Sequence, residues 1–142
     1  MEKKNHAVAY VDGSYSNNIA GYGVVFFYED AKEPEYFSGR CKSASMNNVY
    51  GEIEASLFAV NKALEYGCSS IDIFYDYIGI EHWATGAWRA KKEETMVYRD
   101  QMNFFKRMID IQFHHVEAHT GDRWNEKADD LAVNAVLGKK EE

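Results

Sequence analysis

Four acidic residues stand where a carboxylate is costly unless a cation or a hydrogen-bond donor meets it. Asp12 and Asp76 each follow a short, largely apolar stretch of strand-forming character. Glu52 opens a segment with helical periodicity, and Asp129 lies beside the apolar face of a later one. A buried carboxylate must be paired, hydrogen-bonded or bound to a metal. Because hard cations such as Mg²⁺ prefer carboxylate oxygens, we expect these four acids to form one magnesium site.

The hydrophobic pattern predicts the elements that bring these acids together. The predicted strands cover residues 7–12, 22–28, 35–41, 71–76 and 111–118. The first three are joined by turn-rich segments, 13–21 among them, and form an antiparallel meander. Predicted helices begin near Glu52, at Gly79, before Tyr98 and near Asn125; the first ends at Gly67 and the last at Gly138.

Glu52 falls in the first turn of its predicted helix, where the helix dipole favours a carboxylate. The order strand, helix, strand between residues 7 and 76 implies a right-handed crossover and a parallel strand pair. Asp12 and Asp76 then leave adjacent strands at their carboxyl ends, which is where ligands bind in open α/β sheets.

The overall composition indicates a globular protein that remains in a reducing compartment. We expect the 142 residues to form one domain, residues 1–142, and the 46% hydrophobic content argues against disorder. The two cysteines form no disulfide framework, and no stretch of 18 apolar residues or targeting signal is visible, so we expect a cytoplasmic protein without membrane contact. The net charge of −7 counts against a simple nucleic-acid binder, although residues 89–107 are locally basic.

Several motifs together resemble the type 1 ribonuclease H family. They are Tyr10–Ser14, Gly51–Ala55, Tyr75–Asp76, and the pair His119–Gly121 and Asn125–Asp129. Their order, spacing and expected secondary structure all agree with that family, and the similarity extends from about residue 8 to residue 137. The nearest resemblance is to the bacterial domain that can follow a separate small nucleic-acid-binding domain, of which this chain shows no trace.

The resemblance implies a fold, an activity and a cofactor. The fold would be a five-stranded mixed sheet flanked by helices, with strands four and five parallel to strand one. The activity would be hydrolysis of the RNA strand of RNA–DNA hybrids with two Mg²⁺ ions, or Mn²⁺ as a substitute, leaving 5′-phosphate and 3′-hydroxyl ends. Asp12 would bridge both ions, Asp76 would bind one, and Glu52 and Asp129 the other. His119 would assist proton handling or product departure, and we expect the enzyme to be a monomer.

The same resemblance identifies residues that would contact the substrate. They are Gly13, Ser14, Asn48, Asn125, Arg89, Lys91 and Lys92. The chain departs from the family pattern in two places. Tyr77 stands where the family commonly has serine, and the segment after Trp83 lacks the long Trp/Lys-rich protrusion, for which Trp88–Lys92 would be a shortened substitute.

Two alternatives remain open at the level of the sequence. His115, Glu117 and His119 alternate along the last predicted strand and offer zinc ligands, provided that the strand stays extended through His119. The fold could also serve as a nucleic-acid-binding module without catalysis, because fold does not determine function. The presence of all four acids argues against the second alternative.

Overall fold

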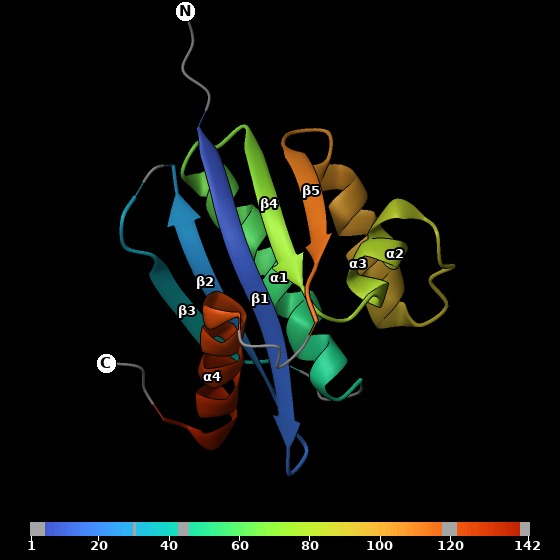
Figure 1. Cartoon of the computed structure of the whole chain (residues 1–142). Coiled ribbons are helices and arrows are strands. Elements are labelled where there is room, and N and C mark those ends of the chain that lie inside the picture. The colour runs from blue at the N-terminus through green and yellow to red at the C-terminus, as the bar shows by residue number, and fades with distance from the viewer. Residues whose placement is uncertain (1–4, 30, 43–45, 118–121, 140–142) are drawn as a thin grey trace, which may run out of the picture.

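The computed structural model describes residues 5–29, 31–42, 46–117 and 122–139. Its elements, in chain order, are β1 (His6–Ser16), β2 (Ile19–Tyr28), β3 (Glu35–Arg40), α1 (Asn48–Glu65), β4 (Ser70–Tyr75), α2 (Gly79–Thr85), α3 (Glu93–Phe105), β5 (Asp110–His115) and α4 (Arg123–Leu137). Figure 1 shows them as one sheet with helices on both sides.

The five strands form a single mixed sheet in the order β3-β2-β1-β4-β5. β1 pairs with β2 and β2 with β3 in antiparallel fashion, whereas β4 is parallel to both β1 and β5. The connection between β3 and β4 passes through α1, because β2 and β1 lie between these two strands and the chain must cross the sheet to place β4 parallel to β1. The predicted meander and the predicted parallel arrangement of strands one, four and five are therefore confirmed.

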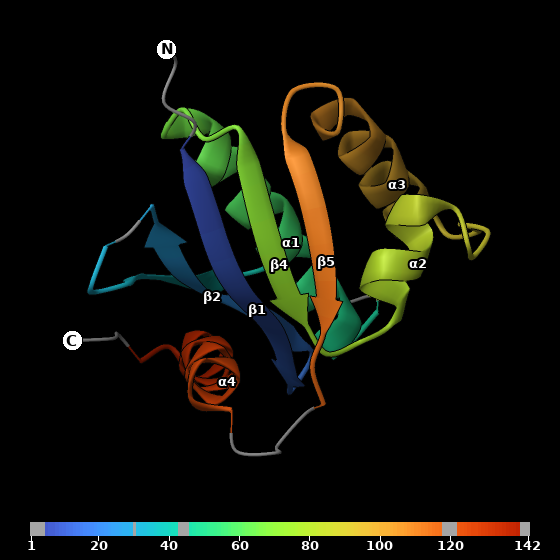
Figure 2. The same cartoon turned by 45° about the horizontal axis from the view of Figure 1, so that its top comes forward.

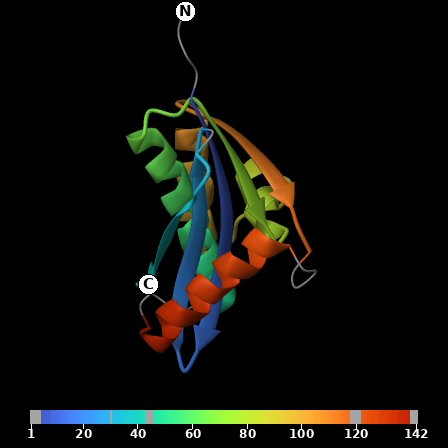
Figure 3. The same cartoon turned by 60° about the vertical axis from the view of Figure 1, so that its left-hand side comes forward.

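Helices cover the two faces of the sheet unequally. α1 lies against one face, with α2 and α3 beside it at the β5 side (Figure 2). α4 crosses the opposite face over β1, β2 and β3 (Figure 3). On that face no helix of the described part of the chain lies over β4 and β5 (Figure 2).

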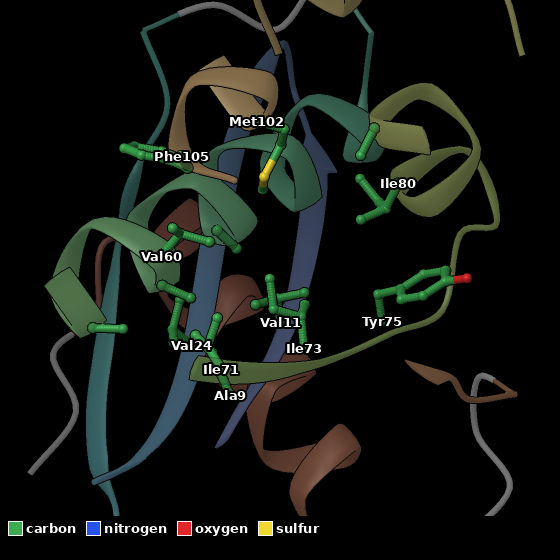
Figure 4. Close-up of a cluster of buried hydrophobic side chains, with 14 of the residues drawn as sticks. Ala9, Val11, Val24, Val60, Ile71, Ile73, Tyr75, Ile80, Met102 and Phe105 are labelled. Atoms are coloured by element: carbon green, nitrogen blue, oxygen red, sulfur yellow. The ribbon is translucent and has the colours of Figure 1, made fainter. Parts of the chain in front are cut away.

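The main core lies between the sheet and α1. The alternation within β4 is typical of a strand with one buried face: Ile71, Ile73 and Tyr75 are fully buried, and the residues between them are partly exposed. Val11 and Val24 meet them from β1 and β2 (Figure 4). Burying each side chain of this size contributes about 1.5–3 kcal/mol, so this layer holds α1 firmly on the sheet.

The first hairpin is longer than the sequence pattern predicts. Residues 13–21 were expected to form a loop, but the β1–β2 ladder continues to the pair Ser16 and Ile19. The turn consists of Asn17 and Asn18 alone, whose φ angles of 50° and 62° suit a two-residue hairpin turn, and asparagine tolerates such angles. Asp12 therefore lies inside β1 and not at its end.

Two other predicted boundaries are also wrong, and a third, the start of α4, is confirmed to within two residues. α1 begins at Asn48, so Glu52 lies beyond the first turn and the helix-dipole argument does not apply to it. β5 ends at His115 and not at residue 118. α4 begins two residues before Asn125, because the carboxylate of Asp122 accepts hydrogen bonds from the backbone N–H groups of Trp124 and Asn125, at 3.0 and 2.9 Å, and caps the helix there.

Candidate active site

The strand register places Asp12 beside Asp76. The parallel ladder between β1 and β4 ends with the pair Tyr10 and Phe74, and each aspartate follows two residues later, Asp12 within β1 and Asp76 one residue past the end of β4. Because parallel neighbours advance together, the two carboxylates reach the same edge of the ladder. The expectation that they emerge side by side holds, although Asp12 is still paired with Gly23 of β2 on its other side.

Two glycines bring α1 close enough to β1 to add Glu52 to this pair. A methyl group on Gly13 would overlap the carbonyl oxygen of Asn48, and one on Gly51 would overlap the carbonyl oxygen of Gly21. The helix and the hairpin therefore touch backbone to backbone, which only glycine allows. This contact places Glu52, the next residue in α1, directly behind Asp12.

The three carboxylates form a compact, buried cluster. One carboxylate oxygen from each of Asp12, Glu52 and Asp76 lies within 4.8 Å of the other two. Asp12 is 7% exposed and Glu52 2% exposed, whereas Asp76 is more accessible to solvent. Such proximity of like charges at low exposure is unfavourable without a cation.

The electrostatics of the cluster reflect this crowding. Burial, followed by the charge of Asp76, raises the pKa of Asp12 to about 8, against the opposing effect of the Gly13 N–H group. Burial also raises the pKa of Glu52 well above its usual value, with further contributions from Asp76 and Asp12. At neutral pH without metal, the cluster therefore retains protons that a divalent cation would displace.

Backbone groups hold the carboxylates in place. The N–H groups of Asp76 and Tyr77 donate to the two carboxylate oxygens of Glu52, at 2.9 and 3.2 Å. The N–H of Gly13 lies 2.8 Å from Oδ1 of Asp12. The carbonyl oxygen of Asp76 is 2.9 Å from Nε2 of His115 in β5, so the peptide that carries this aspartate is fixed on both sides.

Asp129 approaches the cluster from the opposite face of the sheet. A methyl group on Gly23 would overlap the backbone of α4 at Ala128, so this glycine allows α4 to lie directly on β2. Asp129 follows Ala128 in α4, and both its charge and a side-chain hydrogen bond raise the pKa of Asp12. All four predicted acids are thus brought to one place, three of them in mutual contact range.

The donor set fits divalent metal ions. Within the described residues it consists of carboxylate oxygens only, the ligand type that hard cations prefer, and two of the carboxylates are nearly inaccessible to water. Asp12 is close to both Asp76 and Asp129, since the charges of both raise its pKa. Together with Glu52, these carboxylates are the groups that would hold such ions.

The residues predicted to contact the substrate differ in their exposure to solvent. Gly13 is buried against α1, whereas Ser14 is partly exposed in β1 and Asn48 is exposed at the start of α1. Asn125 is 3% exposed in the first turn of α4, and its Oδ1 atom has no hydrogen-bond partner among the described residues. His119 falls outside the described residues.

The basic segment forms a separate hollow next to an aromatic cluster. Arg89, Lys91 and Lys92 line a cavity of about 290 Å³ together with Met46, Tyr77, Trp83 and Thr95. The rings of Tyr77, Trp83 and Trp88 pack against one another, with centroids 5.7 to 6.2 Å apart. The side chain of Tyr77 thus turns towards tryptophan, and the backbone N–H of the same residue serves Glu52.

The zinc alternative finds no support. β5 ends at His115, so the extended strand that this site requires does not include Glu117. The ring of His115 instead contacts the carbonyl group of Asp76. This contact was missed at the sequence level, because nothing in the pattern shows which backbone oxygen a histidine reaches.

Comparisons with known proteins agree with this geometry. The family model described as RNase H matches residues 4–137. The Ribonuclease H of Francisella philomiragia is 30% identical over 148 residues, which cover 94% of this chain and 93% of that protein. The Ribonuclease H of a Wolbachia strain from Drosophila simulans is 26% identical over 153 residues, which cover 96% of this chain and 99% of that protein.

Solved structures show the same fold. RNase H1 from the archaeon Halobacterium salinarum superposes with a TM-score of 0.79 at 25% identity, covering 94% of this chain and 98% of that one. LC11-RNase H1, crystallised in complex with an RNA/DNA hybrid, has a TM-score of 0.77 at 19% identity over 93% of this chain. The fold and the acidic site define a metal-dependent nuclease of the ribonuclease H type. The chain belongs to the RNase H family and is a ribonuclease H enzyme.

Proposed function

We propose that this enzyme hydrolyses the RNA strand of RNA–DNA hybrids with two Mg²⁺ ions, leaving 5′-phosphate and 3′-hydroxyl ends. The observation that carries the proposal is the buried cluster of Asp12, Glu52 and Asp76, which has the donor type and spacing for divalent ions. The substrate class is supported by the similarity to LC11-RNase H1, which binds an RNA/DNA hybrid in its crystal structure.

The four acids would share the ions between them, with Asp12 in contact with both. Glu52 and Asp76, whose carboxylate oxygens lie within 4.8 Å of each other and of Asp12, would hold one ion. Asp129 of α4 would hold the other, in place of the pairing of Glu52 with Asp129 that the sequence suggested. Two bound divalent ions about 4 Å apart activate water and stabilise the leaving oxygen of a phosphodiester. The peptide N–H groups of Asp76 and Tyr77 orient Glu52 before any ion binds, so little rearrangement is needed.

Substrate contacts would surround the acids on two sides. Ser14 and Asn48 are accessible close to the cluster, where polar side chains can meet the 2′-hydroxyl groups that distinguish RNA from DNA. Arg89, Lys91 and Lys92 would hold phosphates of the other strand further away. His119 would assist proton handling or product departure, and replacing it with alanine should slow turnover by roughly 10- to 100-fold without abolishing it.

The proposal is tested by incubating the chain with labelled RNA–DNA hybrid, duplex RNA and duplex DNA, with Mg²⁺ or with EDTA. Cleavage of the RNA strand of the hybrid alone, dependent on Mg²⁺ and producing ends that a 5′-phosphate-dependent exonuclease accepts, is the expected result. Asp12→Asn should lose this activity, whereas Asp130→Asn changes an exposed neighbouring acid and serves as the matched control. Activity of Asp12→Asn above a few per cent would contradict the two-ion scheme. Inactivity of the wild type with retained hybrid binding would favour a binding module.

A further inference from the structure

Two adjoining hollows form a groove on the side of the α1–α3 pair that faces away from the sheet. One has a volume of about 250 Å³ and the other of about 420 Å³. They share Glu54, Leu57 and Val97 as lining residues, so they form one continuous depression. We call this depression the α1–α3 groove.

The groove has an apolar floor and an apolar border. Leu57 and Phe58 of α1 face Val97 and Phe105 of α3 across it. Val97, which lines both hollows, is 47% exposed, and Phe104, two helical turns further along α3 and next to the lining residue Phe105, is 56% exposed. Large side chains exposed together in this way mark interaction surfaces more often than isolated ones do.

The charge of the groove is entirely of one sign. Glu54, Glu93 and Glu94 line it, and no lysine or arginine occurs among the described residues of either hollow. The pKa of Tyr50 at one end is raised by burial and then by the charges of Glu54 and Glu94. A ligand of this groove must therefore be apolar and positively charged, which excludes the phosphate backbone of a nucleic acid.

We propose that the α1–α3 groove is a docking surface for a basic amphipathic helix of a protein partner. A helix placed between two others packs its ridges into the groove that they form. The lining residues of α1 run from Tyr50 to Asn61, which corresponds to about 16 Å, or three helical turns. A helix of that length buries leucine-type side chains at positions i, i+3/i+4 and i+7, while flanking lysines meet the three glutamates.

Docking there leaves the active site accessible. Glu54 lines the groove, and Glu52, two residues earlier, is in the acidic cluster on the other side of α1. Residues two positions apart project from nearly opposite sides of a helix. A partner helix in the groove would therefore attach the enzyme to another protein while the acidic site remains free to meet its substrate.

The test uses a fluorescein-labelled helical peptide of 14 residues with leucines on one face and lysines beside them. Fluorescence anisotropy should show saturable binding in the micromolar range, about −8 kcal/mol or weaker. Amide shifts of the ¹⁵N-labelled protein should change along Tyr50–Asn61 and Glu93–Phe105 only. Val97→Ser, which removes apolar surface from an exposed lining position without changing the charge, should weaken binding by at least about tenfold. Phe104→Ser should act in the same direction.

Charge specificity is tested by a matched pair of variants. Glu54→Lys and Glu33→Lys change the net charge equally, but Glu33 lies in an exposed turn outside the groove. Only Glu54→Lys should reduce the affinity strongly. Equal weakening by both variants, or equal binding of a peptide with glutamates in place of lysines, would show non-specific attraction and overturn the proposal. Sedimentation could instead show that the unliganded protein self-associates, with concentration-dependent shifts of the same amides. That result would identify a second copy of this chain as the occupant and would also overturn the proposal.

Discussion

At the residue scale, burial and the proximity of like charges make the ionised form of the acidic cluster unfavourable in the absence of a cation. Asp12 and Glu52 are almost inaccessible to solvent, and their carboxylates lie next to Asp76. Gly13, Asp76 and Tyr77 provide the only described backbone donors to them. A carboxylate that is both buried and close to like charges favours its neutral form unless a positive charge is present.

The first prediction concerns pH and stability without metal. Folded Asp12 keeps its proton up to about pH 8, whereas its ordinary pKa is 3.8. Between these values the folded state binds more protons than the unfolded state, so the free energy of unfolding should decrease as the pH rises from about 4 to 8. Asp12→Asn should reduce this slope and be more stable than the wild type at pH 8 by about 1–3 kcal/mol. Urea denaturation in EDTA at pH 5 and pH 8 measures both effects. A slope equal to that of the wild type would show that Asp12 does not titrate in this range.

The second prediction assigns His115 a positioning role for Asp76. Its Nε2 atom lies 2.9 Å from the carbonyl oxygen of Asp76. His115→Ala should raise the Mg²⁺ concentration for half-maximal activity by about tenfold, as loss of outer-shell partners of metal ligands commonly does, with KM for the hybrid nearly unchanged. His115→Gln, whose amide can still donate to this oxygen, should restore most of the metal affinity. If alanine and glutamine behave alike, the hydrogen bond does not position Asp76.

At the element scale, glycines determine how closely the helices approach the sheet. Gly13 and Gly51 allow backbone contact between β1 and α1, and Gly23 allows it between β2 and α4. Each contact places the adjacent acid, Glu52 or Asp129, next to Asp12. The geometry of the site therefore depends on residues that have no functional group.

The third prediction follows for Gly13→Ala. The added methyl group would overlap the carbonyl oxygen of Asn48 and displace α1, at a cost of about 1–3 kcal/mol in the free energy of unfolding. Because Glu52 moves with α1, the thermal stabilisation by Mg²⁺ should also decrease. Differential scanning calorimetry with and without Mg²⁺ measures both quantities. Ser16→Ala, at the exposed end of β1, is the control and should change neither by more than about 0.5 kcal/mol. Normal stability and normal Mg²⁺ response of Gly13→Ala would disprove this view of the contact.

At the scale of the whole molecule, charge is distributed unevenly over a chain with a net charge of −7. The basic hollow of Arg89, Lys91 and Lys92 lies beside the aromatic cluster, whereas the α1–α3 groove is acidic. Nucleic acid should therefore approach the side of the basic hollow and not the side of the α1–α3 groove. Within the described residues, no helix has both the length and the apolar character needed to span a membrane.

The fourth prediction is that this chain binds hybrid weakly and loses affinity as salt rises. Each phosphate that a lysine or arginine neutralises contributes about one unit to the slope of log K against log salt, so a slope of only a few units is expected. Reversing the charge of Arg89, Lys91 and Lys92 together should raise KM strongly and spare much of kcat. Steady-state kinetics and filter binding at several salt concentrations measure this.

The control for that variant reverses three exposed cations elsewhere, Lys32, Lys42 and Lys139, with the same change in net charge. It should change KM far less. An unchanged KM and salt slope of the Arg89/Lys91/Lys92 variant would show that this segment is only a solvated surface. Equal effects of both triple variants would indicate a response to net charge alone.

Much of this protein is determined by its sequence alone. Apolar alternation and helical spacing predict all five strands and the order of the helices, and Gly67 and Gly138 mark helix ends with φ angles of 78° and 79°. The register of the parallel strands β1 and β4 then brings Asp12 next to Asp76, because each aspartate comes two residues after the last pair of the ladder between them. These features depend on local periodicity and on turn chemistry, which the sequence shows directly.

Only the tertiary structure decided where Asp12 stands in its strand, how Glu52 is held and what His115 contacts. Strand length depends on the partner strand, since pairing with β2 carries β1 on to Ser16. The bonds to Glu52 and from His115 join backbone groups to side chains 24 to 39 residues away. Every residue except proline has the same N–H and C=O groups, so no sequence pattern distinguishes the ones that will be used. Their choice follows from packing, and the same packing forms the α1–α3 groove.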